Sequence, residues 1–249
     1  MTELTIGEVL HILQHGTVEI EGLLPWSSNY AFLVRACDGP IELGAVYKPE
    51  RGERPLWDFP QGTLCLRERA AFVVSEAIDW HVVPPTVLRD GQHGPGSVQL
   101  FIDHDPNRHY FTIEGDETLR PQLQKMALLD ILINNADRKA GHVLIQESDE
   151  ANEIERLWGI DHGICFHVDP KLRTVIWEFG GAPIPATLKR DMEAFREKLS
   201  DPAGELVVEL GKLLSPAEIE ALQRRLDRLI SRSAFPQPGA GRHYPWPPV

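Results

Sequence analysis

The hydrophobic pattern of this 249-residue chain changes its period once, between residues 103 and 117. Before this point, short runs alternate apolar and polar residues, as strands do. After it, apolar residues recur every three or four positions, as in amphipathic helices. A chain of this length suits one large domain or two small lobes around a cleft. We therefore predict an α+β fold with a strand-rich N-terminal part and a helical C-terminal part.

The N-terminal part contains five candidate strands and two candidate helices. Turn residues separate the first three strands, so residues 17–49 predict an antiparallel meander. A helix over 66–80 has one apolar stripe, and residues 3–14 predict a short amphipathic helix. The candidate strands are residues 17–24, 30–37, 41–49, 82–90 and 96–103.

The C-terminal part begins with a long helix over 117–134, which ends in a polar loop. Two strands then flank an acidic turn and predict a hairpin. The last helix has a strong start signal, because Ser215 can cap it and Glu218 completes a capping box. The tail, 234–249, is rich in Pro and Gly and predicts an extended or disordered segment. Its Tyr244 and Trp246 could dock on the body of the protein, and the alternative is a flexible end. The remaining candidate elements are the strands 142–147 and 155–160 and the helices 185–199 and 215–230.

The net charge of −12 argues against nucleic acid and against an anionic membrane as partners, because both require basic patches. No apolar run is long enough to span a membrane, and we expect no stable membrane anchor. The N-terminus lacks the layout of a signal peptide. The cysteines Cys37, Cys65 and Cys165 are isolated, which is typical of buried thiols in a reducing compartment. We therefore expect a cytoplasmic protein.

Two pairs of charged residues lie at the ends of predicted elements. Lys48 ends a strand and Glu68 begins the helix 66–80, so the two can form an ion pair that readies the ammonium for a phosphate. The alternatives are a solvated edge lysine and an acid that favours the helix dipole. Asp137 and Asp161 fall at the same open end of the predicted hairpin. Two carboxylates there can bind Mg²⁺, although turn and cap aspartates would give the same pattern.

Seven motifs in this order give the chain a family resemblance: SSN between two strands, VYKP, LRE-x-AA, VVPPT, GSVQLF, NNADRKAGH and GIDHGICF. The chain resembles the phosphatidylinositol 3-/4-kinase-like superfamily, nearest its type II phosphatidylinositol 4-kinase and HipA-like branch, and a group of actinobacterial proteins that shares this resemblance. The resemblance implies a two-lobed, atypical protein-kinase-like fold. It implies a single kinase-like domain over 1–249, with an N-lobe (1–103), a C-lobe (104–233) and the Pro/Gly-rich tail.

The resemblance also implies a role for each motif residue, with ATP and Mg²⁺ or Mn²⁺ as cofactors. In the C-lobe, Asp137 would be the catalytic aspartate, Arg138 would steady its loop, and Asp161 would hold the metal ion. In the N-lobe, Lys48 would contact the α/β-phosphates with Glu68 as its partner. The remaining implied nucleotide contacts are Ser27, Ser28 and Asn29 in the phosphate-covering turn and Phe101, Ile102 and Asp103 in the hinge.

The chain departs from the family pattern at two places. The phosphate-covering turn has no glycine, and His142 replaces the Asn expected five residues after Asp137. An imidazole suits Mn²⁺ better than Mg²⁺, so His142 predicts either a preference for Mn²⁺ or a second metal that is not bound in this way. His162 and His167 add imidazoles nearby; each would be either a further ligand or a packing histidine.

The predicted function is an ATP-dependent phosphotransferase that acts on a hydroxyl of a soluble protein or small molecule rather than of a phosphoinositide. Three alternatives remain open: a pseudokinase or nucleotide-sensing module, a nucleotidyl transferase, and a metallohydrolase. The first would bind nucleotide without turnover and the second would transfer adenylate. The third would use Asp137, Asp161 and the nearby histidines, but HExxH spacing is absent from the sequence.

Overall fold

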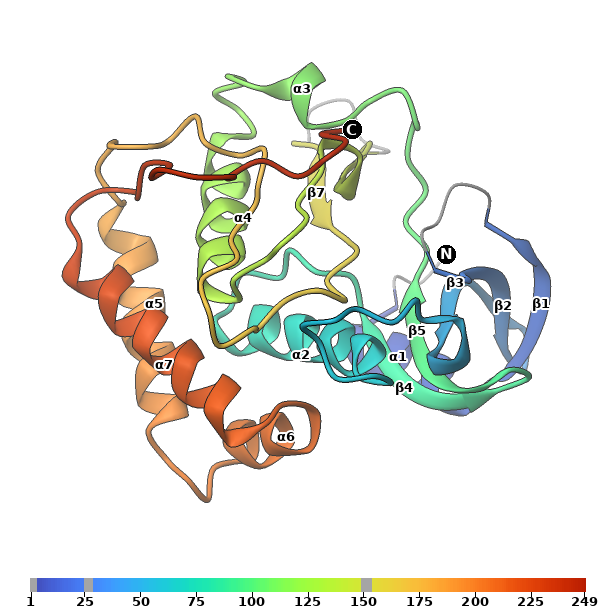
Figure 1. Cartoon of the computed structure of the whole chain (residues 1–249). Coiled ribbons are helices and arrows are strands. Elements are labelled where there is room, and N and C mark those ends of the chain that lie inside the picture. Colours follow the sequence, from blue (N-terminus) through green and yellow to red (C-terminus); the bar gives the residue numbers. More distant parts are fainter. Residues whose placement is uncertain (1–3, 25–28, 149–153) are drawn as a thin grey trace.

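The computed structural model describes residues 4–24, 29–148 and 154–249, which form two lobes (Figure 1). The N-terminal lobe contains a five-stranded antiparallel sheet in the order β1-β2-β3-β5-β4. All five predicted strands are present, and the predicted meander forms the β1-β2-β3 part of the sheet. The strands are β1 (Thr17–Leu23), β2 (Phe32–Asp38), β3 (Ile41–Pro49), β4 (Thr86–Gly91) and β5 (Gly94–Leu100).

Helix α1 (Ile6–His15) covers one face of this sheet. A capping box between Thr5 and Glu8 fixes its first turn. The buried side chains of the helix and the sheet form one small core, which supports β3 from behind. Its members are Val9, Ile12, Leu13, Val34, Ala36, Ala45, Tyr47, Val87 and Val98.

Helix α2 (Leu64–Ala77) lies between the sheet and the C-terminal lobe and shares a hydrophobic core with that lobe. It begins two residues before the predicted start at residue 66 and ends three before the predicted end. Glu68 therefore lies in the second turn and not in the first, and it is only 3% exposed. It is therefore not the first-turn acid, favoured by the helix dipole, that was the alternative interpretation of the sequence.

The C-terminal lobe is built around α4 (Arg120–Leu132), whose Leu123, Met126 and Leu129 are fully buried. The predicted hairpin is present as β6 (Val143–Gln146) and β7 (Arg156–Gly159). The other elements are the helices α3 (Tyr110–Ile113), α5 (Ala186–Leu199), α6 (Glu205–Leu213) and α7 (Pro216–Ser231) and the 3₁₀ turns η1 (Glu50–Gly52) and η2 (Ala140–His142).

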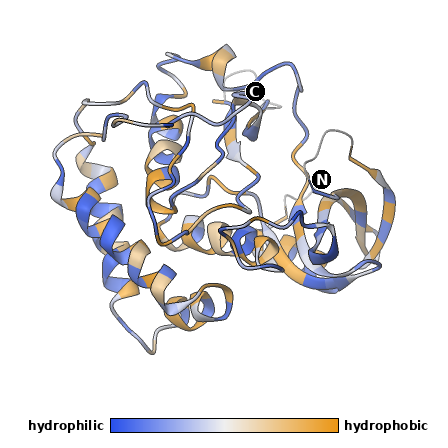
Figure 2. Ribbon diagram, in the orientation of Figure 1, coloured by the Kyte–Doolittle hydropathy of each residue, from blue (hydrophilic) through white to orange (hydrophobic). Residues whose placement is uncertain are grey.

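The last helix, α7, starts as the sequence predicts. Ser215 accepts a hydrogen bond from the Glu218 N–H group, and the Glu218 carboxylate bonds back to Ser215. Hydrophilic and hydrophobic residues alternate along the helix (Figure 2), and its apolar side packs on α4 and α5.

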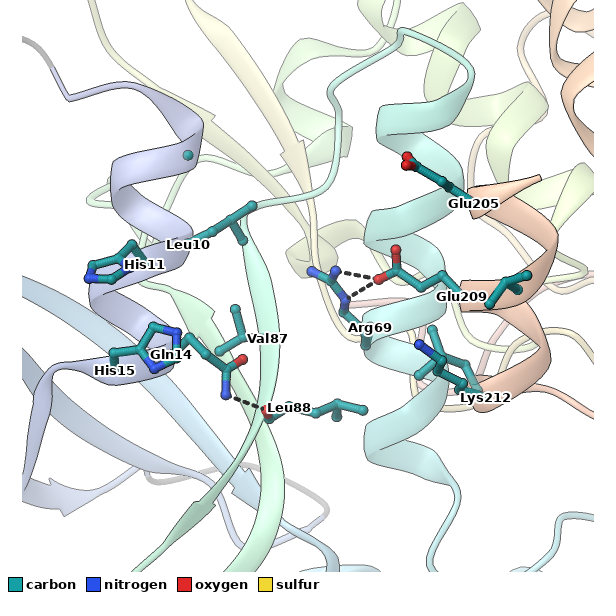
Figure 3. A pocket seen from close by; sticks show the side chains of 13 residues that line it. Leu10, His11, Gln14, His15, Arg69, Val87, Leu88, Glu205, Glu209 and Lys212 are labelled. Carbon is teal, nitrogen blue, oxygen red and sulfur yellow. Dashed lines mark hydrogen bonds and ion pairs between the residues drawn. The ribbon is translucent and has the colours of Figure 1, made fainter. Parts of the chain in front are cut away.

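Helices α2, α6 and α7 join the two lobes through ion pairs. Arg67 is buried and its Nη2 atom lies 2.6 Å from the Glu218 carboxylate of α7. Arg69 pairs with Glu209 of α6, at one side of a groove of about 920 Å³ between α1 and α6 (Figure 3). On the other side, Gln14 of α1 donates a hydrogen bond to a carbonyl of β4. The two ion pairs tie α2 to the helical lobe, and the Gln14 hydrogen bond fastens α1 to the sheet.

The tail crosses the C-terminal lobe and ends near β7 (Figure 1). It has no regular secondary structure, as predicted, but it is docked. Phe235 is buried, and the carbonyls of His243 and Pro248 accept hydrogen bonds from Thr174 and Ala140. Tyr244 and Trp246, the two residues that could have docked through their side chains, are 50% and 77% exposed. The tail is therefore held mainly by its backbone.

Candidate active site

Lys48 is the centre of the site. Near the end of β3, its Nζ atom lies 2.5 Å from the Glu68 carboxylate and 3.0 Å from Oδ1 of Asp161. Burial alone would lower the pKa of Lys48, but the charges of Asp161 and Glu68 outweigh this effect and raise it. The positive charge of Lys48 in turn lowers the pKa of Asp161. Lys48 is thus charged and links α2 to the loop after β7.

Glu68 also fixes the segment that carries Asp161. Its second carboxylate oxygen accepts a hydrogen bond from the backbone N–H of His162, at 3.0 Å. Asp161 adopts a positive φ of 61°, and a Cβ atom on Gly163 would lie 3.4 Å from Cβ of Leu64 in α2. The predicted Lys48–Glu68 pair is therefore present, and it positions Asp161 as well as the lysine.

The polar loop after α4 holds Asp137 through two asparagines and a buried acid. Asn135 accepts a hydrogen bond from the Asp137 N–H group and donates one to Asp130 of α4. Asn134 adopts a left-handed φ of 55°, which asparagine tolerates, and donates to the carbonyls of His167 and Asp169. The loop is consequently fastened both to α4 and to the segment after Asp161.

Arg138 is completely buried, and its guanidinium connects four parts of the site. It forms hydrogen bonds with both oxygens of Asp130, with the carbonyls of His142 and Ile160, and with Nε2 of His162. A Cβ atom on Gly159 would lie 3.1 Å from this guanidinium, so the glycine leaves room for it. These contacts join Arg138 to α4 and to both ends of the β6–β7 hairpin, and its role in catalysis stays a prediction.

Asp137 faces a cavity of about 210 Å³ that Lys48 and Asp161 also line. Burial raises the pKa of Asp137, the positive charge of Lys139 lowers it, and the negative charge of Asp161 raises it, with a net rise. The Lys139 ammonium lies 3.4 Å from the Asp137 carboxylate. A carboxylate with a raised pKa is better suited to accept a proton than an ordinary surface aspartate.

His142 contacts both aspartates. Its Nδ1 atom lies 2.9 Å from the Asp137 carbonyl oxygen and 3.4 Å from the Lys139 backbone nitrogen. The carbonyl is the closer partner, and it can only accept a hydrogen bond. We therefore assign the proton to Nδ1. Nε2 then presents its lone pair to the Asp161 carboxylate, 3.3 Å away. Burial lowers the pKa of His142 to about 4, so the ring is neutral near pH 7.

A bound divalent ion would fit this pair of electron donors, because a lone pair and a carboxylate oxygen repel one another unless a cation lies between them. In the described part of the chain no group of three or more His, Cys, Asp or Glu side chains is arranged to hold a metal ion. A metal ion at Asp161 and His142 would thus need further oxygen ligands, as Mg²⁺ obtains from substrate phosphates and water.

The other two histidines have different partners. His162 is fully buried and accepts a hydrogen bond from Arg138. His167 bonds through Nε2 to the carbonyl of Asp58 and accepts the Asp169 N–H at Nδ1. Both ring nitrogens of His167 are therefore occupied, which agrees with a packing histidine.

A larger cavity of about 480 Å³ opens between the sheet and the C-terminal lobe. Lys48, His142 and Asp161 line it, and apolar residues of both lobes form its walls. Phe101 and Ile102 also line it, whereas Asp103 does not. The Phe101 N–H already donates to the Gly44 carbonyl. The apolar wall residues are Leu24, Ala31, Val46, Leu100, Leu144 and Ile160.

The predicted phosphate-covering turn is only partly described. Ser27 and Ser28 lie outside the described residues. The Asn29 side chain accepts a hydrogen bond from the backbone N–H of Arg54 and lines the 210 Å³ cavity. Asn29 is thus tied to the loop between β3 and α2, and its contact with a phosphate stays a prediction.

Sequence reasoning misses Asp130 and the loop between β3 and α2. Asp130 is inside the apolar run LLDILI and is fully buried. A lone acid among apolar residues is unusual, but nothing in the sequence identifies its partner. The loop contributes Glu53, Arg54 and Leu56 to the 210 Å³ cavity, and Asp58 contacts Lys171 at 2.7 Å. Nothing in the spacing of these residues indicates that contact.

Solved structures share this architecture. The Golgi casein kinase with Mn/ADP bound superposes with a TM-score of 0.60 at 16% identity, covering 91% of this chain and 74% of that one. The Helicobacter pylori proinflammatory kinase CtkA superposes with a TM-score of 0.51 at 11% identity, covering 89% and 94%. The fold is that of the two-lobed atypical kinases, which confirms the predicted fold class.

Sequence relatives define the family. The family model of phosphatidylinositol 3- and 4-kinase matches residues 88–204. The chain is 36% identical to protein Rv2133c of Mycobacterium tuberculosis (strain ATCC 25618 / H37Rv), over 95% of this chain and 94% of that protein. It is 32% identical to phosphatidylinositol 4-kinase gamma 4 of Oryza sativa subsp. japonica over 42% of this chain, but spans only 20% of that protein. The chain belongs to the phosphatidylinositol 3-/4-kinase-like superfamily, in one family with Rv2133c.

A kinase-like fold that carries this domain indicates a phosphotransferase, and the resemblance seen in the motifs is confirmed. Among the described residues, no helix has the length and apolar character needed to cross a bilayer. The proposed residue boundaries of the two lobes and the tail stay predictions.

Proposed function

We propose that the protein transfers the γ-phosphate of ATP to a hydroxyl group of a soluble protein or small molecule. The observation that supports this most strongly is the position of Lys48, whose Nζ atom contacts both Glu68 and Asp161 beside the 480 Å³ cavity. An ammonium held between two carboxylates is pre-organised for a phosphate, because it needs no rearrangement to meet one.

The nucleotide would occupy the 480 Å³ cavity. Its apolar walls suit the adenine ring, and Lys48 would contact the phosphates. Because the Phe101 N–H is bonded to Gly44, the hinge contact with adenine would come from Ile102. Asp161 and His142 would hold the divalent ion, which when bound offsets the negative charge of the phosphates.

Asp137 would receive the acceptor's proton. As the acceptor oxygen bonds to the γ-phosphorus, the bond from that phosphorus to the ADP oxygen breaks, and the hydroxyl proton passes to the Asp137 carboxylate. The raised pKa of Asp137 favours this transfer. The 210 Å³ cavity beside Asp137, with Arg54 and Leu56 in its lining, is the proposed place of the acceptor group. Its small volume favours a single side chain or a small polar alcohol.

Two substitutions test the assignments separately. Asp161→Asn should abolish the thermal stabilisation by ATP with Mn²⁺ or Mg²⁺, because it removes a metal ligand. Asp137→Asn should keep that stabilisation and lower phosphate transfer from labelled ATP to lysate fractions about 100- to 10,000-fold. Asp38→Asn, which changes an exposed acid at the end of β2, is the matched control. Unchanged ATP–metal stabilisation in Asp161→Asn would refute the metal assignment.

His142 gives the proposal a sharper test. His142→Asn should shift the preference of both binding and transfer from Mn²⁺ towards Mg²⁺, because an amide oxygen is a harder ligand than an imidazole nitrogen. The ratio of ATP affinities measured with the two metals would report this shift. An unchanged ratio would mean that His142 is not a metal ligand.

A pseudokinase is the second candidate, and the occupied Phe101 N–H and the imidazole at residue 142 favour it. It predicts ATP binding without a labelled product in the lipid, protein or metabolite fractions. Mass spectrometry of any product also tests nucleotidyl transfer, since an added adenylate differs in mass from an added phosphate.

A further inference from the structure

A separate cavity of about 310 Å³ lies between α7, the end of α4 and residues 168–172. Four arginines line it, and we refer to it as the arginine pocket: Arg224, Arg225, Arg228 and Arg232. Among the described residues that line it there is no aspartate or glutamate. None of its lining residues lines the 480 Å³ cavity, so the two are distinct sites.

The charge in this pocket is unbalanced. In a chain of net charge −12, four cations line one cavity. Of the four arginines, only Arg224 forms an ion pair with a described residue. Its partner is Glu220, one turn earlier on α7, at 2.6 Å. Like charges held together repel one another unless an anion offsets them. The pocket therefore attracts negatively charged ligands.

Arg225 supplies a hydrogen-bond donor that has no partner. Its Nε donates to the Leu132 carbonyl at 2.7 Å and its Nη1 to the His167 carbonyl at 3.2 Å. Its Nη2 atom is buried and, within the described residues, forms no hydrogen bond. Burial, together with the positive charges of Arg224 and Arg228, lowers the pKa of Arg225 to about 10, so it stays charged near pH 7. A buried charged donor without an acceptor is costly.

The rest of the lining is mainly apolar. Ile131, Leu172 and Leu229 contribute to it, and Val168 at its edge is 42% exposed. A simple inorganic anion would use only the arginines, whereas an organic anion would also cover this apolar surface. The volume is in the lower range of small-molecule sites.

We propose that the arginine pocket binds a small, soluble organic phosphate, with the phosphate monoester on the arginines and the organic part on Ile131, Leu172 and Val168. A phosphate monoester carries nearly two negative charges and three acceptor oxygens, which matches several guanidinium groups better than a single carboxylate does. This inference does not depend on the proposed transfer reaction.

The test is calorimetric titration of the full chain with phenyl phosphate, with phenol and methyl phosphate as matched ligands. Phenyl phosphate should bind more tightly than either, because it has both the charge and the ring. The double variant Arg228→Glu/Arg232→Glu should weaken its binding about tenfold or more. Both side chains are exposed, so the fold should tolerate the change. Arg190→Glu, an exposed charge reversal on α5, should leave the affinity unchanged.

Two further measurements distinguish binding in the arginine pocket from binding in the nucleotide cavity and from binding to a membrane lipid. Lys48→Ala should keep phenyl phosphate binding, and Arg228→Glu/Arg232→Glu should keep stabilisation by ATP with Mn²⁺. Phosphatidylcholine vesicles that contain phosphatidic acid provide a lipid-borne phosphate monoester. The proposal would be overturned if phenyl phosphate did not bind, if Arg190→Glu lost as much affinity for it as the double variant, or if the protein bound only the vesicles.

Discussion

Arg138 is the residue on which the geometry of the site depends most. It is completely buried, and its charge is balanced by Asp130, which is buried equally deeply. The same guanidinium holds the carbonyls before and after the β6–β7 hairpin, so it sets the position of both Asp137 and Asp161. A lysine at this position would reach one or two of these acceptors at most.

Replacing Asp130 by Asn should destabilise the protein by about 3–5 kcal/mol, because a buried arginine would lose its counter-charge. Urea unfolding of the variant and of the unchanged protein measures this difference. Glu117→Gln removes the acid of an exposed ion pair with Arg120 and should cost at most about 1 kcal/mol. Similar losses of unfolding free energy in the two variants would show that the buried ion pair stabilises the protein no more than the exposed one.

Single residues were predictable where a motif fixes their spacing. Lys48, Glu68, Asp137 and Asp161 come together as the sequence predicts, although Glu68 lies in the second turn of α2 and not at the start of the helix. Asp130 was not predictable, since a helical acid in an apolar run has no motif that reveals its partner. Long-range contacts of this kind depend on packing and not on local sequence.

At the scale of elements, α2 connects the site to both lobes, through Glu68 and through the ion pairs of Arg67 and Arg69. Beyond its last turn the chain takes two left-handed residues, Asp79 and His81, and His81 lies between the carboxylates of Glu76 and Asp79. Burial alone would lower the pKa of His81, but the hydrogen bonds to both acids raise it above the ordinary value of 6.5. The end of this helix therefore carries a pH-dependent contact.

The protonated His81 should stabilise the fold fully below about pH 6.5, and this contribution should disappear as pH rises through the raised folded-state pKa. His81→Asn keeps a side chain that tolerates a left-handed φ but removes the titration. The difference in melting temperature between the unchanged protein and the variant should therefore shrink from pH 6 to pH 9. A difference that stays constant over this range would contradict the prediction.

Elements were predictable where periodicity and capping agree, and less so elsewhere. The capping box places the start of α7 correctly, whereas β4 begins at Thr86 rather than at residue 82 because Pro84 and Pro85 precede it. The sequence does not predict α6, in which two adjacent valines and Gly211 weaken the helical signal. This helix forms because Leu210 and Leu213 are buried against the body of the lobe.

At the scale of the whole molecule, the tail is hydrogen-bonded to the loop that carries Asp137. Removing residues 243–249 should expose the backbone N–H groups of Ala140 and Thr174, whose acceptors are Pro248 and His243. Hydrogen exchange at these two amides should accelerate while the amides of the β1-β2-β3 meander stay protected. Trp246→Ala, a change at an exposed side chain, is the control, and it should leave both rates unchanged.

This arrangement also has a consequence for biosynthesis. Domains fold as they emerge from the ribosome, N-terminal parts first. The sheet of the N-terminal lobe uses only residues up to Leu100 and can form early. The loop that carries Asp137 receives its last backbone acceptor from Pro248, more than 100 positions later. During translation, the proposed catalytic loop can therefore reach its final set of hydrogen bonds only after residue 248 has left the exit tunnel.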